Sequence, residues 1–259
     1  MGPQMIRSLR KDPSSGGSLP GSLPSPELLE LQAGWLAPAR AQLLRRVHIA
    51  RRHRVLDLGT GTGSVLPELS RRAGGMVIGL DRSLQALQAG RTDGAHRVAA
   101  DGMRLPFRNG MLDLILSQLA LLWISPVRKV IAEVWRALEP GGVLVALEPD
   151  YGGMIEYPEA IATRDLWLQA LERAGADPWI GRRLPGMLEE QGFAVSVSLF
   201  DTLSIADPAR FGFLRELPLT EEEEQQLDQA ERAAQQLTGT WSQVAHLPFF
   251  LIRATKPEA

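Results

Sequence analysis

Glycines at alternating positions, Gly59, Gly61 and Gly63, follow a short apolar run that contains an aspartate, Asp57. An apolar run that leads into a glycine-rich turn and then a helical pattern is typical of the first strand, loop and helix of a Rossmann-like sheet. Because glycine has no Cβ, such a loop can turn sharply and lets the backbone approach a ligand closely. We therefore expect this loop to bind a nucleoside-like cofactor.

Two further aspartates end the next predicted strands, and they narrow the choice of cofactor. Asp81, 20 residues beyond Gly61, is placed to accept hydrogen bonds from both hydroxyls of a ribose. Asp101 could accept a hydrogen bond from an adenine amino group, and Asp57 would repel a phosphate but suit a cationic ligand. An adenosine with a free ribose diol, no phosphate and a positive charge describes S-adenosylmethionine.

A dinucleotide is the alternative ligand for a glycine loop of this kind. The dinucleotide fingerprint is G-x-G-x-x-G, but the third glycine, Gly63, falls one position early, and Ser64 stands where the fingerprint needs glycine. Asp57 would also face the pyrophosphate. Both observations count against a dehydrogenase.

Strand-like and helix-like segments alternate around these residues, which predicts a doubly wound α/β sheet. In such a sheet the ligand binds beside the carboxyl ends of the parallel strands, where Asp57, Asp81 and Asp101 are expected. The strands are predicted at residues 54–58, 76–80, 97–100, 113–117, 143–147, 193–200 and 249–255.

The first part of the chain is predicted to lie outside this sheet. Residues 12–26 are rich in Gly, Ser and Pro, so residues 1–25 are expected to form a flexible leader. A helical pattern follows as far as about Val47, and Pro38 is expected to break it into two helices.

Two helical segments, at about 151–191 and 205–240, are inserted after the fifth and sixth strands and are expected to cover one end of the sheet. In the first segment Pro185 is expected to open the final helix, and Gly192 to end it. In the second, Thr220 begins a capping box, so the acidic run after it is interpreted as a helix start rather than a metal site.

Four motifs occur in order along the chain: VLDLGTGTG (55–63), IGLD (78–81), AADGMRLPF (99–107) and LEPGG (138–142). On these motifs the chain resembles the class I S-adenosylmethionine-dependent methyltransferases. It is most similar to the small-molecule branch that includes the quinone C-methyltransferases. The resemblance implies a methyltransferase domain over residues 26–259, built on a seven-stranded Rossmann-like sheet that is mostly parallel and has an antiparallel last strand.

The resemblance also implies which residues bind the cofactor. The glycine loop passes the amino acid part of the cofactor, with Asp57 beneath it, and Asp81 binds the ribose. Residues 101–103 meet the adenine, and residues 117–118 face the methionine side. The full set is Asp57, Gly59, Thr60, Gly61, Gly63, Asp81, Arg82, Asp101, Gly102, Met103, Ser117 and Gln118.

Some of these residues also have a purely structural explanation. Asp57 and Asp101 could each be a helix N-cap, and Met103 could fill the core. The four motifs in order favour the cofactor role.

The acceptor site is expected over the carboxyl ends of the fourth and fifth strands. Methyl transfer needs chiefly an in-line approach of the reactants, and a general base is needed only if the acceptor keeps its proton at neutral pH. The sequence assigns no catalytic residue, and His246, Tyr151 and Glu156 are the candidates. Other side chains near this site could hold a polar or cationic small molecule, or could simply pack the cover: Trp123, Glu148, Asp150, Tyr157, Trp179 and Arg183.

Three details of this region leave its chemistry open. His246 could be structural, and Arg182 with Arg183 could bind a substrate carboxylate or form a surface pair. The fourth strand is followed by Ser117-Gln118-Leu119-Ala120, not by the Asn/Asp-Pro-Pro-Tyr/Phe motif that marks amino-nitrogen methylation of adenine or glutamine in related enzymes. These targets are therefore disfavoured.

The composition excludes several classes of function. The chain of 259 residues has a formal charge of −2 and no cysteine, so disulfides, thiolate nucleophiles and cysteine metal sites are excluded. No spacing of His and carboxylates suggests a metal site. Neither a signal peptide nor a membrane-spanning stretch is found, so a cytoplasmic enzyme is expected.

The expected partner is a small-molecule acceptor, without binding to membranes or nucleic acid. The basic run 45–54 is interpreted as a solvated face, because it leads into the amino end of the first strand. Two alternatives stay open: a methyltransferase that acts on RNA or protein through this run, and a protein that binds the cofactor without transferring its methyl group. The oligomeric state does not follow from the sequence.

Overall fold

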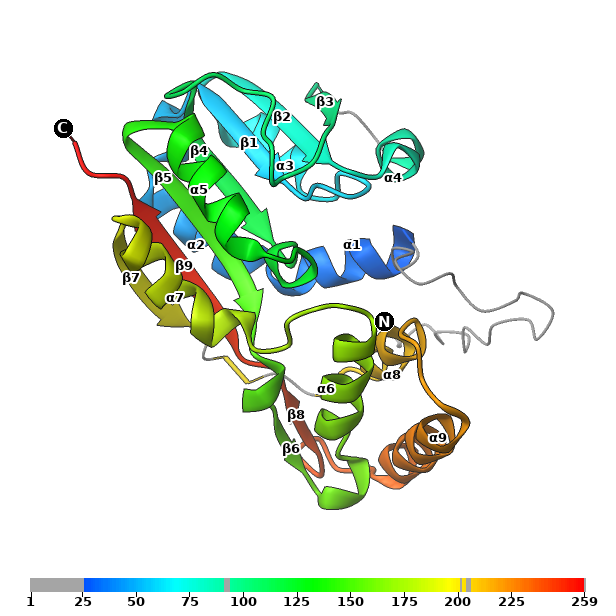
Figure 1. Cartoon of the computed structure of the whole chain (residues 1–259). Coiled ribbons are helices and arrows are strands. Elements are labelled where there is room, and N and C mark those ends of the chain that lie inside the picture. The colour runs from blue at the N-terminus through cyan, green and yellow to red at the C-terminus, as the bar shows by residue number, and fades with distance from the viewer. Residues whose placement is uncertain (1–25, 91–93, 201, 204–205, 259) are drawn as a thin grey trace.

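The computed structural model describes residues 26–90, 94–200, 202–203 and 206–258. Its centre is a seven-stranded sheet in the order β3-β2-β1-β4-β5-β9-β7 (Figure 1). Strands β1 to β5 pair in parallel, and β9 is antiparallel to both of its neighbours. This confirms the predicted Rossmann-like sheet with an antiparallel last strand. The strands are β1 (Arg54–Leu58), β2 (Met76–Asp81), β3 (His96–Ala99), β4 (Leu112–Gln118), β5 (Leu138–Pro149), β7 (Ala194–Leu199) and β9 (Phe249–Thr255).

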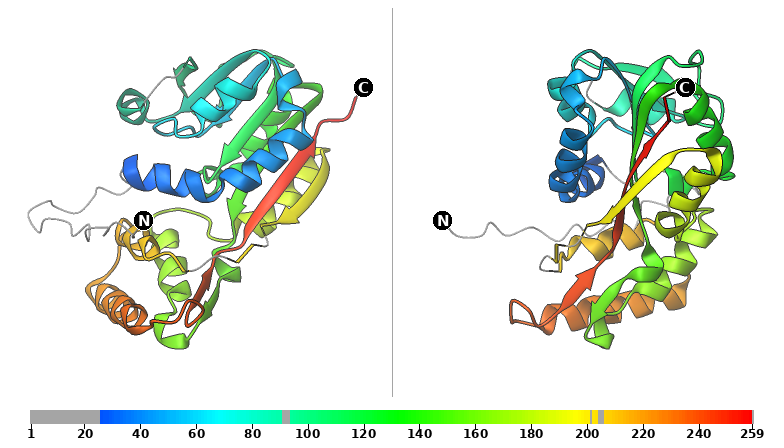
Figure 2. Two further views of the ribbon diagram at one scale, coloured as in Figure 1. Left: turned by 180° about the vertical axis from the view of Figure 1, so that it is seen from behind. Right: turned by 90° about the vertical axis from the view of Figure 1, so that its left-hand side faces the viewer.

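Helices cover both faces of the sheet, as the two views of Figure 2 show. Successive residues of a strand point to opposite faces: Leu114 and Leu116 lie in one apolar cluster, and Ile115 lies in the other. Both faces are therefore buried, which is why the central strands appear in the sequence as nearly continuous apolar runs. The first cluster includes α2 (Ala37–Arg46) and α3 (Leu66–Arg72), and the second includes α5 (Val127–Ala137) and α7 (Ile180–Gln191).

The other long elements lie beyond the carboxyl ends of the parallel strands (Figure 1). One of them, α1, contacts α8 and the residues just before it, where the Trp35 Nε1 donates a hydrogen bond to the Asp207 carboxylate at 3.1 Å. The Trp35 ring also lies 5.1 Å from that of Phe213. These elements are α1 (Pro26–Trp35), α6 (Arg164–Arg173), α8 (Ala209–Arg215), α9 (Glu221–Gln236) and an antiparallel ribbon of β6 (Ile155–Tyr157) and β8 (Val244–His246).

Several local predictions are confirmed by these boundaries. The helical pattern before β1 is broken at Leu36, so that Pro38 lies in the first turn of α2. Thr220 and Glu223 form the expected capping box, in which each backbone N–H is bound by the other's side chain. Gly192 ends α7 in a left-handed conformation, with a φ of 107°. The predicted leader, residues 1–25, lies outside the described residues. The predicted division of the chain into this leader and a single domain over residues 26–259 stays a prediction.

The prediction that Pro185 opens a helix is wrong, because α7 begins five residues earlier, at Ile180. Proline inside a helix removes one hydrogen bond and crowds the preceding turn. Here the helix is held through the proline by its apolar face: Ile180, Leu184 and Leu188, spaced four residues apart, are all fully buried. Tertiary packing outweighs the local preference.

The segment after β5 was expected to be helical throughout, and it is not. Between Pro149 and α6 it contains only the 3₁₀ turns η3 (Tyr151–Gly153) and η4 (Glu159–Ile161), with β6 between them. β6 pairs with β8, which the sequence analysis also missed, because three-residue strands are too short to show an alternating pattern. Residues 139–142 were expected to precede the fifth strand as a turn, but they form an irregularity inside β5, where the register with β4 shifts.

Candidate cofactor and acceptor site

The glycine loop lies between β1 and α3 and is held in a conformation that favours glycine. Gly59, Gly61 and Gly63 have φ angles of 75°, 54° and 87°. The N–H groups of Gly59 and Thr60 both donate to the carbonyl of Leu80 in β2, at 2.8 and 3.0 Å. A Cβ added at Gly59 would lie 2.3 Å from the Cβ of Ala120. The loop is thus fixed between β2 and the segment that follows β4.

Asp57 lies within β1 and beneath this loop, so it is not a helix N-cap. Its carboxylate accepts a hydrogen bond from the Thr60 hydroxyl at 2.6 Å, and the residue is only 3% exposed. Burial raises its pKa to about 6, although the Thr60 bond and the charge of Arg40 oppose this shift. The structure therefore places an acid of intermediate pKa below the loop.

Asp81, the last residue of β2, already holds part of the loop. Its two carboxylate oxygens accept the N–H groups of Gly61 and Ser83, each at 2.8 Å. A carboxylate can accept about four hydrogen bonds, so each oxygen retains room for another donor. This is the arrangement that a ribose diol requires. The neighbouring Arg82 is exposed.

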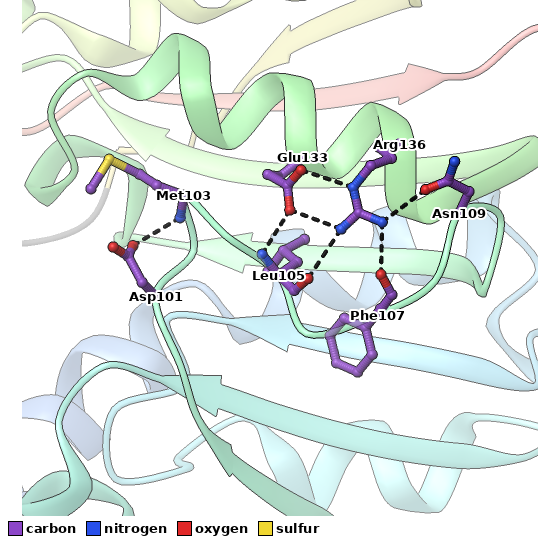
Figure 3. Close-up of polar contacts among 7 residues, drawn as sticks. All are labelled: Asp101, Met103, Leu105, Phe107, Asn109, Glu133 and Arg136. Carbon is purple, nitrogen blue, oxygen red and sulfur yellow. Dashed lines mark hydrogen bonds and ion pairs between the residues drawn. The ribbon is translucent and has the colours of Figure 1, made fainter.

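Asp101 follows β3 and turns the chain toward α5 (Figure 3). One of its oxygens accepts the Met103 N–H at 2.8 Å, so Asp101 is a turn residue and not a helix N-cap. Its other oxygen accepts no hydrogen bond from the described residues, and the side chain is exposed. Gly102 is buried, and a Cβ there would lie 3.3 Å from the side chain of Leu58. The turn is therefore packed against the end of β1.

Ser117 and Gln118 end β4 and point to opposite faces of the sheet. Ser117 is fully buried, and its hydroxyl lies 3.4 Å from the carboxylate of Glu148. Gln118 faces α2, where its side-chain oxygen accepts a hydrogen bond from Arg40 at 2.7 Å. The two residues therefore contact different elements.

Arg40 is a residue of this site that the sequence analysis missed. It is 4% exposed, pairs with Glu68 of α3 at 2.8 Å, and donates to the carbonyl of Ala33. With its bond to Gln118, it connects the helices before β1 to the end of β4. A signal was present, because Arg40 lies four residues before the apolar Leu44 and so on the apolar face of α2.

Glu148, near the end of β5, is the buried acid on the acceptor side. It is fully buried, and one oxygen accepts the N–H groups of Leu121 and Ala120, at 3.0 and 3.3 Å. The other oxygen has no partner among the described residues. Burial raises the pKa of Glu148 to about 7. Its bonds fix the turn after β4, in which Leu119 has a φ of 56°.

The three candidate bases lie in different surroundings. Tyr151 is buried, its ring stacks on Trp167 at 4.9 Å, and burial raises its pKa, with the charge of Glu148 adding to the shift. Glu156 accepts the backbone N–H groups of Thr163 and Arg164 at the start of α6. It also pairs with Arg210 of α8, whose side chain is 12% exposed. The structure thus uses Glu156 as a helix cap.

His246 is the third candidate and lies on β8, opposite Ile155 of β6. Burial lowers its pKa, and a hydrogen bond to the backbone of Phe200 acts in the opposite direction.

Both arginines proposed for a substrate carboxylate already have partners. Arg182 binds Asp150 through two nitrogens, at 2.9 and 2.6 Å, and its guanidinium lies over the ring of Trp179. Arg183 pairs with Asp177 at 3.1 Å. A cavity of about 330 Å³ opens beside this second pair, but no predicted cofactor residue lines it.

The described part of the chain has neither a cluster of metal ligands nor a membrane-spanning helix. No group of three or more His, Asp or Glu side chains in residues 26–90, 94–200, 202–203 and 206–258 is arranged to hold a metal ion. None of the helices in this described part is long and apolar enough to cross a membrane. The cytoplasmic location stays a prediction.

Comparison with known proteins identifies the central segment. Residues 56–146 match the family described as "Methyltransferase domain". Malonyl-[acyl-carrier protein] O-methyltransferase of Marinomonas sp. is 38% identical over 112 residues, which are 41% of this chain and 42% of that protein. Demethylmenaquinone methyltransferase of Corynebacterium kroppenstedtii is 37% identical over 95 residues, 37% of this chain and 41% of that protein. The chain thus spans less than half the length of either relative.

A solved structure shares the fold over most of the chain. Geranyl diphosphate C-methyltransferase from Streptomyces coelicolor A3(2), in complex with S-adenosyl-L-homocysteine, superposes with a TM-score of 0.57. The match covers 86% of this chain and 80% of that one, at 16% identity.

The residues of the site fit S-adenosylmethionine. The carboxyl ends of β1 and β2 and the turn after β3 each present an acid, and the loop between them allows a close backbone approach. The chemistry of this donor set suits a ribose diol, an adenine amino group and a positive charge, but not a pyrophosphate. Residues 56–146 thus form a domain of the matched methyltransferase family, and the four ordered motifs and this sheet order make the chain similar to the class I S-adenosylmethionine-dependent methyltransferases.

Proposed function

We propose that this protein transfers the methyl group of S-adenosylmethionine to a small-molecule acceptor. The observation that carries the proposal is the set of three acids, Asp57, Asp81 and Asp101, around the glycine loop. The bound cofactor supplies an activated methyl group on a sulfonium, which is a good leaving group. The protein's part is to bind and orient both reactants, and this alone can contribute about 7–11 kcal/mol.

Each acid has a distinct task in the proposed complex. Asp81 accepts the ribose hydroxyls on the lone pairs that Gly61 and Ser83 leave available. The unpartnered oxygen of Asp101 accepts the adenine amino group, and the negative charge of Asp57 stabilises the cationic part of the cofactor. Thr60, Arg82, Gly102, Met103, Ser117 and Gln118 complete the proposed site.

The acceptor is proposed to bind over the carboxyl ends of β4 and β5, beside Tyr151. If the acceptor must lose a proton, Glu148 is the group we propose to receive it. Its pKa of about 7 suits proton transfer at neutral pH, and one of its oxygens has no partner among the described residues. Glu156 is less suited, because its carboxylate binds the start of α6, and His246 is less suited, because its ring is bound to the backbone of Phe200.

Two acceptors are the first to assay, because they appear in the names of the relatives: demethylmenaquinone and malonyl-[acyl-carrier protein]. We expect label from methyl-labelled S-adenosylmethionine to appear in one of these products, and the Asp81→Asn variant to transfer it more slowly. Cofactor binding without transfer to any acceptor would instead support a protein that only binds the cofactor. Lack of binding and of transfer would overturn the proposal.

A macromolecular acceptor is the other possibility raised by the basic run 45–54. In the structure Arg52 donates to two backbone carbonyls, and Arg54 pairs with Glu139. This run precedes β1, so it lies at the amino end of the strand, opposite the cofactor residues. Its position supports a solvated face, and a gel shift at low salt would count against that interpretation.

A further inference from the structure

The turn that follows β3 has no regular secondary structure, yet it carries the residues proposed to meet the adenine. Residues 100–111 contain neither helix nor strand, and their ends are fixed by β3 and β4. Within this stretch the Asp101 side chain is exposed, so its direction depends on how the backbone around it is held. Side chains of α5 provide that support.

Arg136 of α5 holds the turn at alternate residues (Figure 3). Its guanidinium donates to the carbonyl oxygens of Leu105 and Phe107, at 3.0 and 2.7 Å, and to the side-chain oxygen of Asn109 at 3.0 Å. Its remaining N–H groups bind Glu133 at 2.8 Å. Every N–H of this guanidinium therefore has an acceptor.

Glu133 completes the support from one turn earlier on α5. It accepts the Leu105 N–H at 2.8 Å, so that both backbone polar groups of Leu105 are bound by the pair. The hydrogen bonds from Arg136 hold the pKa of Glu133 below its usual range, and the carboxylate keeps its charge. Leu105 itself is buried in the apolar cluster next to α5.

From these contacts we infer that Glu133 and Arg136 are positioning residues that set the base specificity of the cofactor site. They touch neither the base nor the reacting atoms. They fix the Leu105–Asn109 backbone, and this fixes the turn in which Asp101 presents its free oxygen to the adenine amino group. The inference rests on the proposed function.

The fork shape of arginine is essential to this role. A guanidinium directs its N–H groups along fixed, coplanar directions, whereas a lysine ammonium is a single point with three donors. Arg136→Lys therefore keeps the positive charge beside Glu133 but cannot bind Leu105, Phe107 and Asn109 together. The turn then loses its fixed geometry.

The test compares two neutral cofactor analogues by calorimetry, S-adenosylhomocysteine and S-inosylhomocysteine. The inosine base carries an oxygen where adenine has the amino group, so this position accepts a hydrogen bond and no longer donates one to Asp101. We expect the wild-type protein to bind the adenosine compound about tenfold more tightly or better, the effect of one hydrogen bond to a charged group. In Arg136→Lys the ratio should fall to within about threefold, because the turn no longer holds Asp101 in place.

Arg128→Lys is the matched control, because Arg128 lies on the same helix in an exposed ion pair with Glu190, its side chain 60% exposed. It should keep the wild-type ratio. Glu133→Gln should give an intermediate ratio, because its amide oxygen can still accept the Leu105 N–H. Glu133→Gln also serves as the test variant if Arg136→Lys does not fold.

The outcomes separate the inference from the proposed function. If Arg136→Lys, or Glu133→Gln in its place, keeps the wild-type ratio, the inference is overturned while cofactor binding stands. Equal affinities of the wild type for the two compounds would overturn the role of Asp101, and with it the inference. If the wild type binds neither compound, the proposed function itself fails.

Discussion

Asp57 is the most buried of the three acids around the glycine loop, and its charge depends on pH in an accessible range. Burial raises its pKa to about 6, so a cation bound nearby would favour the ionised form and lower that pKa. Binding of the cationic cofactor and release of this proton are therefore linked.

We predict that S-adenosylmethionine binds more tightly as the pH rises through 6. Asp57 loses its charge below its folded-state pKa of about 6, so the affinity should be about tenfold higher at pH 7.5 than at pH 5. Calorimetry over this range checks the prediction. Asp57→Asn, which is neutral at every pH, should give a nearly flat profile. A profile with the same slope in the variant would show that another group is responsible.

Glu148 gives a second pH-dependent effect, on stability rather than on binding. Its pKa rises from an ordinary 4.5 to about 7 in the folded protein, so the folded state holds an extra proton between these values. The free energy of unfolding therefore falls as the pH rises through this window.

Glu148→Gln should remove this dependence. Relative to the wild type, the variant should gain up to about 3 kcal/mol of stability between pH 4.5 and pH 8, measured by denaturant unfolding. A constant offset is also expected, because the glutamine N–H₂ would take the place of the unpartnered oxygen. If the free energy of unfolding changes with pH in the same way in both proteins, the raised pKa of Glu148 is contradicted.

For single residues, the sequence indicates the acids of the proposed site but not the residues that support them. Asp57, Asp81 and Asp101 stand out because each interrupts, ends or follows an apolar run. The roles of Arg40, Glu133 and Arg136 depend on contacts between segments 27 or more residues apart. Periodicity along the chain does not report such contacts.

Among the elements, the loop after β1 and the turn after β4 are packed directly against each other. The left-handed Gly59 leaves no room for a side chain, since its Cβ would lie 2.3 Å from that of Ala120. Ala120 in turn is held by its N–H bond to Glu148. The contact connects the cofactor side of the site to the acceptor side.

Gly59→Ala should therefore lower the free energy of unfolding by about 2–4 kcal/mol, from the left-handed backbone and the overpacked contact together. In an Ala120→Gly background the overpacked contact disappears, and Gly59→Ala should then lower the free energy of unfolding by only about 1–2 kcal/mol. Gly94→Ala is the control, because Gly94 also has a positive φ, 84°, but no atom within 4 Å of an added Cβ. If Gly59→Ala lowers the free energy of unfolding equally in the wild type and in Ala120→Gly, the contact between Gly59 and Ala120 is not tight.

The elements themselves were predictable where burial produces a clear pattern. β1, β2 and β9 lie within one residue of their predicted limits, because buried strands in a layered sheet are apolar and bounded by turns. The start of α7 and the β6–β8 ribbon were not. In α7 the packing of the apolar face outweighs Pro185, and the ribbon depends on pairing between segments about 90 residues apart.

At the scale of the whole molecule, the proposed site lies between the sheet and the elements beyond its carboxyl ends (Figure 1). Arg40 connects α2 to the end of β4, and Trp35 connects α1 to Asp207 and Phe213 beside the cover. One apolar cluster runs from Leu56 of β1 to Leu227 of α9. One connected framework therefore holds the proposed cofactor site and the proposed acceptor site.

Binding of S-adenosylhomocysteine to the wild type and to Asp81→Asn is the measurement that tests the central claim most directly. Calorimetry should show one site per chain in the wild type. The variant should bind about tenfold more weakly or worse, because it loses the charge and one acceptor for the ribose diol. Asp165→Asn, at a side chain 73% exposed, should match the wild type. Absence of binding to the wild type, or equal affinity of Asp81→Asn, would contradict the account.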